Sequence, residues 1–212
     1  MKKSCVVLLS GGLDSVTTIA KCFHEGYDCH AISFEYGQHH SCEIDFAKYN
    51  AGIYAKTHKV FDMRAVFGEF NSALINNHSS GIGSKNFPKT YVPARNMIFL
   101  SISIGYAESI GCSEVFIGAN AVDYSGYPDC RPEFIDSFQK TANLGTSFDG
   151  KISIKTPLIN MTKTEIIELG MKLGVDYSRT ISCYFPDNGK PCLICDSCKI
   201  RETAFVEVLN AK

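Results

Sequence analysis

The hexapeptide Ser10-Gly11-Gly12-Leu13-Asp14-Ser15 constrains the fold more than any other part of the chain. It follows the apolar run 5–9, which is typical of a strand buried on both faces, and it opens a helical pattern. The glycines let the backbone approach a ligand closely, and a helix beginning near Leu13 offers free N–H groups and a positive dipole end. This arrangement predicts a phosphate site more strongly than an ordinary Gly-Gly turn with a Ser/Asp cap.

The loop is not of the Walker A type, because no lysine follows its glycines at the required place. It carries Asp14 instead, a carboxylate that would repel a polyphosphate unless a divalent cation lay between them. We therefore expect Mg²⁺ together with ATP. The expected phosphate contacts are Ser10, Gly11, Gly12, Asp14 and Ser15. The whole predicted nucleotide-binding segment consists of Leu8, Leu9, Ser10, Gly11, Gly12, Leu13, Asp14, Ser15, Val16, Thr17 and Thr18.

Strand and helix patterns alternate along the chain, which predicts an α/β, Rossmann-like fold with a parallel sheet covered by helices on both faces. No linker or repeat interrupts the 212 residues, so we expect a single domain over 1–212. Expected strands are 5–9, 29–34, 58–61 and 115–119, and expected helices are 13–25, 41–54, 93–110, 132–144 and 163–173. Apolar residues nearly surround the helix 93–110, which predicts that it is buried on all sides.

Ligands of such sheets bind beyond the carboxyl ends of the strands, and three polar segments follow predicted strands there: the loop after Leu9, 35–40 and 120–130. A fourth segment, 91–96, begins a predicted helix. Arg95 lies in a first helical turn against the dipole preference, so it calls for an anionic partner, and we favour a ligand over a protein carboxylate. Asp123 belongs to the segment 120–131, whose mixture of acid, hydroxyl and aromatic groups suits a small planar ligand and equally suits a structural turn. We interpret His39 and His40 as solvated.

The charge balance argues against a nucleic-acid partner, because 21 basic residues face 22 acidic ones without a long basic run. The amino-terminal residues run directly into the predicted phosphate loop and do not resemble a secretory signal. No apolar run reaches the roughly 20 residues of a membrane span. We therefore expect a cytoplasmic protein without membrane contact.

Four of the ten cysteines form a cluster with the spacing Cys-x8-Cys-x2-Cys-x2-Cys over 183–198. Four thiolates around one ion predict a closed, structural zinc site. An iron–sulfur cluster is the alternative. The predicted ligands are Cys183, Cys192, Cys195 and Cys198, and we interpret the other six cysteines as buried, inert thiols.

Several segments in order resemble the 7-cyano-7-deazaguanine synthase family, within the superfamily of N-type ATP-pyrophosphatases. The resemblance rests on Leu8 to Ser15, Ser33 to Gln38, Tyr91 to Asn96, Asp123 to Arg131, Thr156 to Leu158 with Met161 to Glu165, and the segments Ser182 to Tyr184, Pro191 to Cys192 and Cys195 to Cys198. Two positions depart from the family pattern. Glu35 replaces a more usual Asp, which puts any direct role of this carboxylate in doubt, and Leu193 replaces a frequent Gly.

The resemblance implies an adenine nucleotide alpha hydrolase-like fold and ATP-dependent conversion of 7-carboxy-7-deazaguanine and ammonia to the 7-cyano compound by two adenylations. It also implies a homodimer. Asp14, Arg95 and Asp123 are the candidate catalytic residues, with Arg95 facing an anionic group and Asp123 accepting hydrogen bonds from the guanine-like edge. Two alternatives are an ATP-pyrophosphatase that thiolates or amidates tRNA, and a non-enzymatic nucleotide-binding or zinc-ribbon module.

Overall fold

The computed structural model describes residues 2–38, 42–70, 72, 74–75, 90–120, 122 and 127–211. Its parallel sheet has the order β3-β2-β1-β4-β5 and consists of β1 (Ser4–Leu8), β2 (Asp28–Glu35), β3 (Thr57–Asp62), β4 (Glu114–Phe116) and β5 (Ser153–Lys155). The helices are α1 (Leu13–His24), α2 (Cys42–Tyr54), α3 (Arg64–Phe67), α4 (Arg95–Ser109), α5 (Pro132–Gly145), α6 (Lys163–Lys172) and α7 (Asp196–Asn210). Over the described ranges, no helix has both the length and the apolar character that crossing a membrane requires.

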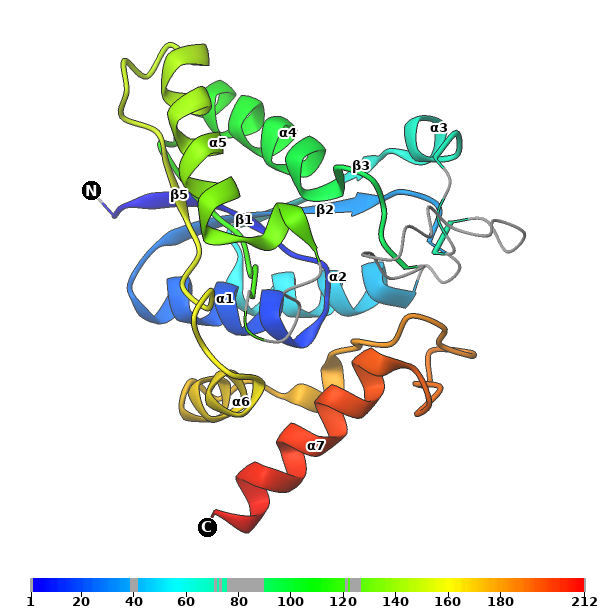
Figure 1. Ribbon diagram of the computed structural model, residues 1–212. Coiled ribbons are helices and arrows are strands. Elements are labelled where there is room, and N and C mark those ends of the chain that lie inside the picture. The colour runs from blue at the N-terminus through cyan, green and yellow to red at the C-terminus, as the bar shows by residue number, and fades with distance from the viewer. Residues whose placement is uncertain are drawn as a thin grey trace.

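Alternate side chains of β1 face opposite sides of the sheet, and helices cover both sides. Cys5 and Val7 belong to the apolar cluster formed with α1 and α2, whereas Val6 and Leu8 belong to the cluster formed with α4 and α5. Figure 1 shows α4 and α5 over one face and α1 and α2 under the other. A strand buried on both faces needs apolar residues at every position. The predicted α/β fold is confirmed.

A further layer of helices, α6 and α7, packs outside α1 (Figure 1). Ile166 and Ile167 of α6 are fully buried in the same cluster as Val16 of α1 and Val208 of α7. α6 begins at a capping box, in which the Thr162 side chain accepts from the Glu165 backbone and the Glu165 carboxylate accepts from the Thr162 backbone. The helix α7 and the short strand β5 were not among the elements expected from the sequence.

The strand order reverses at β1, which lies between β2 and β4. The chain leaves β1 toward β2 on one side and later crosses to β4 on the other, so the connections diverge from the carboxyl ends of β1 and β4. A crevice forms where connections diverge in this way, and it is the usual ligand position in open parallel sheets. The loop 9–12 therefore occupies the position that the sequence predicted.

Two expectations about single elements were wrong in detail. α4 is not buried on all sides, because Met97 is 44 % exposed and the buried residues, among them Phe99, Leu100 and Ile104, form only the face toward the sheet. This helix has more apolar residues than the sheet and its neighbours cover. β4 ends at Phe116 instead of Ala119, and Gly118 then passes against the backbone of Asp14.

Gly170 of α6 shows how closely the outer helices pack. A Cβ at this position would lie 1.9 Å from the hydroxyl of Tyr177, which is 2.8 Å from the Thr17 hydroxyl and donates to the Ile166 carbonyl at 3.0 Å. We expect Gly170→Ala to lower the free energy of unfolding by about 1–3 kcal/mol through overpacking, despite the better helix propensity of alanine.

The matched control is Gly52→Ala in α2, where an added Cβ meets nothing within 4 Å. This substitution should keep or slightly raise the free energy of unfolding. Urea denaturation of both variants measures the difference, and equal midpoints would show that the Tyr177 side chain moves aside without cost.

Candidate functional site

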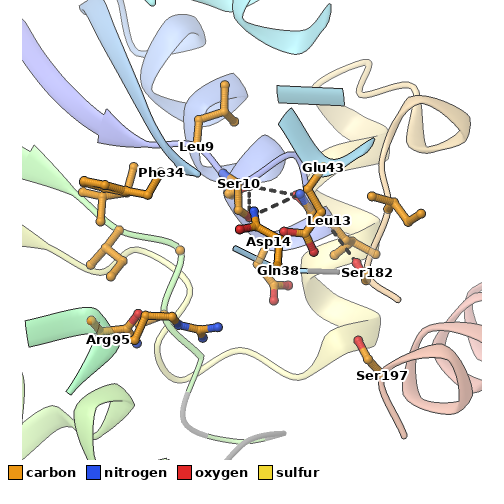
Figure 2. Close-up of a pocket in the computed structure, with 18 of the residues that line it drawn as sticks. Leu9, Ser10, Leu13, Asp14, Phe34, Gln38, Glu43, Arg95, Ser182 and Ser197 are labelled. Atoms are coloured by element: carbon orange, nitrogen blue, oxygen red, sulfur yellow. Dashed lines mark hydrogen bonds between the residues drawn. The ribbon is translucent and has the colours of Figure 1, made fainter. Parts of the chain in front are cut away.

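A cavity of about 270 Å³ lies at the carboxyl ends of β1 and β4 (Figure 2). Its walls come from distant parts of the chain: the loop after β1, the ends of β2 and β4, the first turns of α2, α4 and α6, the segment 181–184, and α7. One side is apolar and includes Leu8, Ile32 and Phe34, and the Phe34 ring stacks on Phe99 with centroids 4.0 Å apart. The other side carries the polar loop and the charged groups.

Gly11 gives the loop its shape. Its φ of +83° is a conformation that favours glycine, and a Cβ there would lie 2.4 Å from the Glu43 carbonyl oxygen of α2. On the other side, the Gly11 carbonyl accepts a hydrogen bond from the Ile181 amide at 3.1 Å. The loop is therefore held between the start of α2 and the segment that precedes the cysteine cluster.

The amide groups of the loop form long hydrogen bonds to serine hydroxyls. The Ser10 amide donates to Ser15 at 3.2 Å, the Gly12 amide donates to Ser10 at 3.3 Å, and the Leu13 amide donates to Ser182 at 3.3 Å (Figure 2). A hydroxyl can rotate and release such a donor to a charged acceptor, which forms shorter and stronger hydrogen bonds. The start of α1 can thus present its N–H groups to an anion.

Asp14 forms a two-pronged ion pair that the sequence did not reveal. Lys163, the first residue of α6, donates to both carboxylate oxygens at 2.7 and 2.9 Å. The Lys163 side chain is only 7 % exposed and that of Asp14 is 23 % exposed. Lys163 therefore already offsets part of the repulsion between Asp14 and a polyphosphate, which was our reason for expecting Mg²⁺.

Arg95 is half-buried in the cavity wall, where its predicted contact with a ligand stays a prediction. Its guanidinium donates to the Tyr36 hydroxyl at 3.3 Å, and it forms no ion pair with any carboxylate of the described residues. Burial opposes its charge, but nearby Tyr36, Asp129 and Cys130 raise its pKa overall. The Asp129 carboxylate accepts instead from the Asn96 amide at 2.9 Å and so caps α4. This part of the segment 120–131 has a structural role.

Arg201 of α7 is a second cavity-lining arginine, which sequence reasoning missed. It donates to the Tyr177 carbonyl at 2.7 Å and to the hydroxyls of Thr180 and Ser182 at 2.9 and 3.4 Å. Burial lowers its pKa. The sequence did hold a signal for Arg201, since this residue follows Cys198 by one helical turn. A helix that is anchored by a metal ligand also fixes the side chain one turn further along the same face.

The charged groups around the cavity favour an anion. Three cationic side chains, Lys163, Arg95 and Arg201, line the described part of the cavity against two carboxylates, Asp14 and Glu43. Burial raises the pKa of Glu43 to about 7, although Arg95 and Gln38 act in the opposite direction. A polyphosphate would find both positive charge and amide donors here.

The four clustered cysteines have the geometry of a metal site. Their sulfurs all lie within 4.8 Å of one another, and the Cys192–Cys198 and Cys183–Cys195 pairs are 4.0 Å apart. A tetrahedral zinc site requires about 3.8 Å between sulfurs, given its Zn–S bonds. The amides of Ile194 and Cys195 help to lower the pKa of Cys192 to about 6, which favours a thiolate. The cluster could therefore hold a metal ion.

Leu193, between two of these cysteines, has a φ of +62°. This is the conformation that suits the glycine found in the family pattern, and a leucine there costs about 1 kcal/mol.

The structure brings most of the predicted nucleotide segment to the cavity, and places a few residues elsewhere. Those that line it are Leu8, Leu9, Ser10, Gly12, Leu13, Asp14 and Ser15. Gly11, an expected phosphate contact, is not part of the lining and packs against the Glu43 carbonyl. Val16, Thr17 and Thr18 are buried in the core behind the loop, where the Thr17 and Thr18 hydroxyls bond to α1 carbonyls. Glu35 forms an ion pair with Arg64, at 3.8 Å. Asp123, His39 and His40 lie outside the described residues.

A family comparison matches almost the whole chain. The profile of the family described as "Queuosine biosynthesis protein QueC" matches residues 4–209. The chain belongs to this family. The 7-cyano-7-deazaguanine synthase of Hydrogenovibrio crunogenus is 51 % identical over 211 residues, which cover 96 % of this chain and 91 % of that protein. The synthase of Geotalea daltonii is 52 % identical over 215 residues, covering 98 % and 93 %.

Solved structures share the fold at low sequence identity. An NMN synthetase from Francisella tularensis has a TM-score of 0.56 at 17 % identity and covers 100 % of this chain and 78 % of its own. A 4-thiouridine synthetase, solved as an RNA complex with bound ATP, has a TM-score of 0.58 at 16 % identity, with coverage of 98 % and 51 %. The fold expected from the family resemblance is therefore confirmed, while these two structures carry no argument about the substrate.

The ion pair between Lys163 and Asp14 can be tested by substitution. Lys163→Met keeps the apolar stem but leaves the Asp14 carboxylate without its cation, so we expect the free energy of unfolding to fall by about 3 kcal/mol. Lys172→Met in the same helix removes an exposed charge, and should change it by at most about 0.5 kcal/mol. Chemical denaturation compares the two variants. Equal effects would contradict a structural role for the pair.

Proposed function

We propose that this chain is an ATP-dependent ligase that converts 7-carboxy-7-deazaguanine and ammonia to 7-cyano-7-deazaguanine, releasing AMP and pyrophosphate. The observation that carries the proposal is the loop after β1, whose amides share one cavity with Lys163, Arg95 and Arg201, in a chain of the QueC family. The relatives cited above bear the corresponding name and match nearly the full chain.

The chemistry explains the need for ATP. A carboxylate is a poor acyl donor because its leaving group would be oxide, and adenylation replaces this group with AMP, so that ammonia can form the amide. Removal of the amide oxygen requires a second adenylation, after which AMP departs and the nitrile forms. One cavity that binds ATP and a planar acid serves both rounds.

The residues divide between the two ligands. We assign the pyrophosphate end of ATP to the backbone amides of the loop, among them that of Gly12, and to the hydroxyls of Ser10 and Ser15. Lys163 and Arg201 would offset the charge of the pyrophosphate as it leaves. Arg95 would face the α-phosphate or the substrate carboxylate. A role for Asp123 at the guanine-like edge stays a prediction, and the apolar side near Phe34 suits a flat base.

Mg²⁺ is part of the proposal as a partner of ATP. Because Lys163 bonds both oxygens of Asp14, we expect this carboxylate to reach the ion through water. The ion would add positive charge at the phosphates, and the protein residues would orient the nucleotide around it.

The cavity chemistry disfavours the alternative of a tRNA-thiolating enzyme. Such an enzyme could use a nucleophilic cysteine, and apart from the cluster residue Cys183 the described cavity wall contains Cys130. Burial raises the pKa of Cys130 to about 11, so its thiol stays protonated near neutral pH and is a poor nucleophile. The formal net charge of −1 also offers no general attraction for RNA.

An assay with defined substrates tests the function. The protein, ATP, Mg²⁺, ammonium and 7-carboxy-7-deazaguanine should yield the 7-cyano product with two AMP per nitrile, and without ammonium only the adenylate should form. Mass spectrometry follows both products. Modified tRNA in place of the nitrile would favour the thiolating or amidating alternative, and a lack of pyrophosphate release with every substrate would favour a binding module.

We propose zinc as the metal of the cysteine cluster. An iron–sulfur cluster would hold its four thiolates farther apart, because several irons lie between them, whereas sulfurs 4.0 Å apart fit one tetrahedral ion. The site would fix Ser182 and Arg201, which adjoin ligands Cys183 and Cys198 and reach the phosphate loop.

We also propose a cytoplasmic homodimer, since ten free thiols suit a reducing compartment and the family resemblance implies a dimer.

Metal analysis of Cys195→Ser tests this assignment. The wild-type chain should contain one zinc, and the variant should lose the metal, unfold at a lower temperature and bind ATP more weakly, because Arg201 and Ser182 lose their support. Cys42→Ser is the control, since Cys42 packs beside the cluster without belonging to it. Iron with sulfide in the wild-type protein, or weak ATP binding by the control, would contradict the proposal.

A further inference from the structure

Glu43 is a carboxylate of the cavity whose position the proposed roles do not explain. It lies in the first turn of α2, and its backbone carbonyl is the group against which Gly11 packs. Its side chain lines the cavity, and Figure 2 shows it near the phosphate loop. Glu43 thus shares the cavity with the loop, and it lies close enough to Arg95 for the charge of Arg95 to lower its pKa.

A second carboxylate beside a polyphosphate site is unfavourable unless it is neutralised or used. Asp14 has Lys163 as its cation, whereas Glu43 forms no ion pair within the described part of the chain. The Gln38 side chain links Glu43 to the segment that follows β2. It accepts a hydrogen bond from the Tyr36 amide at 2.9 Å, and its hydrogen bonding to Glu43 lowers the pKa of that carboxyl group. Burial outweighs this effect and raises that pKa to about 7.

The ligase reaction, on which this inference rests, requires the nitrogen to lose protons. When ammonia attacks the acyl adenylate, the tetrahedral species carries –NH₃⁺ and must lose one proton before the C–O bond to AMP breaks and the amide forms. In the second round, the adenylated amide carries =NH₂⁺. It loses two protons as the C–O bond to AMP breaks and the C≡N bond forms.

We propose that Glu43 is the general base that accepts these protons. Its carboxylate takes a proton from the substrate nitrogen, becomes a neutral carboxylic acid, and passes the proton to water before the next transfer. The position suits this role, because Glu43 shares one cavity with the loop and with Arg95, which would face the α-phosphate at which the bond to AMP forms and breaks. A neutral Glu43 would also cause least repulsion with the leaving AMP.

The other titratable groups that line the described cavity are poorer candidates. The cationic side chains cannot accept a proton, the Asp14 carboxylate is engaged by Lys163, and burial raises the pKa of the Tyr36 hydroxyl and the Cys130 thiol. The Tyr127 hydroxyl is already hydrogen-bonded to the Thr90 hydroxyl, at 2.9 Å. Besides Glu43, the titratable groups of this lining are Asp14, Tyr36, Arg95, Tyr127, Cys130, Lys163, Cys183 and Arg201.

Glu43→Gln tests the proposal, because it keeps the shape of the side chain and removes the base. Adenylation is measured as pyrophosphate–ATP exchange with 7-carboxy-7-deazaguanine and no ammonium, and should stay within about twofold of wild type. Formation of amide and nitrile at saturating ammonium should fall by about 10²–10⁴-fold. In the wild type this rate should rise with pH through about 7, as Glu43 loses its proton, and the variant should lack that inflection.

Two further variants complete the experiment. Asp45→Asn makes the same charge change in the same helical turn at an exposed position and should match wild type. Glu43→Asp keeps a carboxylate one methylene farther away and should recover part of the nitrile formation, even if the Gln variant folds poorly.

The outcomes separate the possibilities. Equal loss of exchange and nitrile formation in Glu43→Gln would show that Glu43 binds ATP, substrate or metal, and would overturn the proposal, as would unchanged rates of both. If the wild-type chain itself shows no exchange with 7-carboxy-7-deazaguanine, the proposed function fails and the inference fails with it.

Discussion

The turn at Gly11 is the contact on which the rest of the site depends. A side chain there would collide with the first turn of α2, and the Gly11 carbonyl also binds the segment that leads to the cysteine cluster. Only close approach on both sides brings the start of α1, Glu43 and Ser182 around one cavity. The phosphate loop therefore joins three parts of the molecule: β1 of the sheet, the first turn of α2, and the segment before the cysteine cluster.

The cysteine cluster takes part in this arrangement. Besides holding the segment 183–198 together, it positions two cavity residues, because Ser182 directly precedes Cys183 and Arg201 follows Cys198 by one turn. Ser182 accepts from the first amide of α1, and Arg201 fixes Ser182 in place. A metal ion at the cluster would thus influence the phosphate loop through two short links, although it has no open position for catalysis itself.

Sequence reasoning succeeded where the signal is local. The strand–loop–helix unit and the cysteine spacing are patterns of neighbouring residues, and Arg95 was noticeable because it opposes the dipole of its own helix. Lys163 gave no such signal, since a lysine after a helix cap is usually solvated, and its partner Asp14 is far away in sequence. The roles of Glu43 and Arg201 likewise depend on tertiary contacts, and the exposure of Met97 reflects how little of α4 the sheet covers.

The distribution of the cavity wall along the chain has a consequence for folding. The phosphate loop follows β1, whereas Lys163 opens α6 and Arg201 lies in α7, so residues far apart in sequence must meet before the cavity exists. Contacts of this kind form at a high cost in chain entropy and slow the folding of a domain. The nucleotide site is thus a product of the completed tertiary structure, and the strand–loop–helix unit alone does not make it.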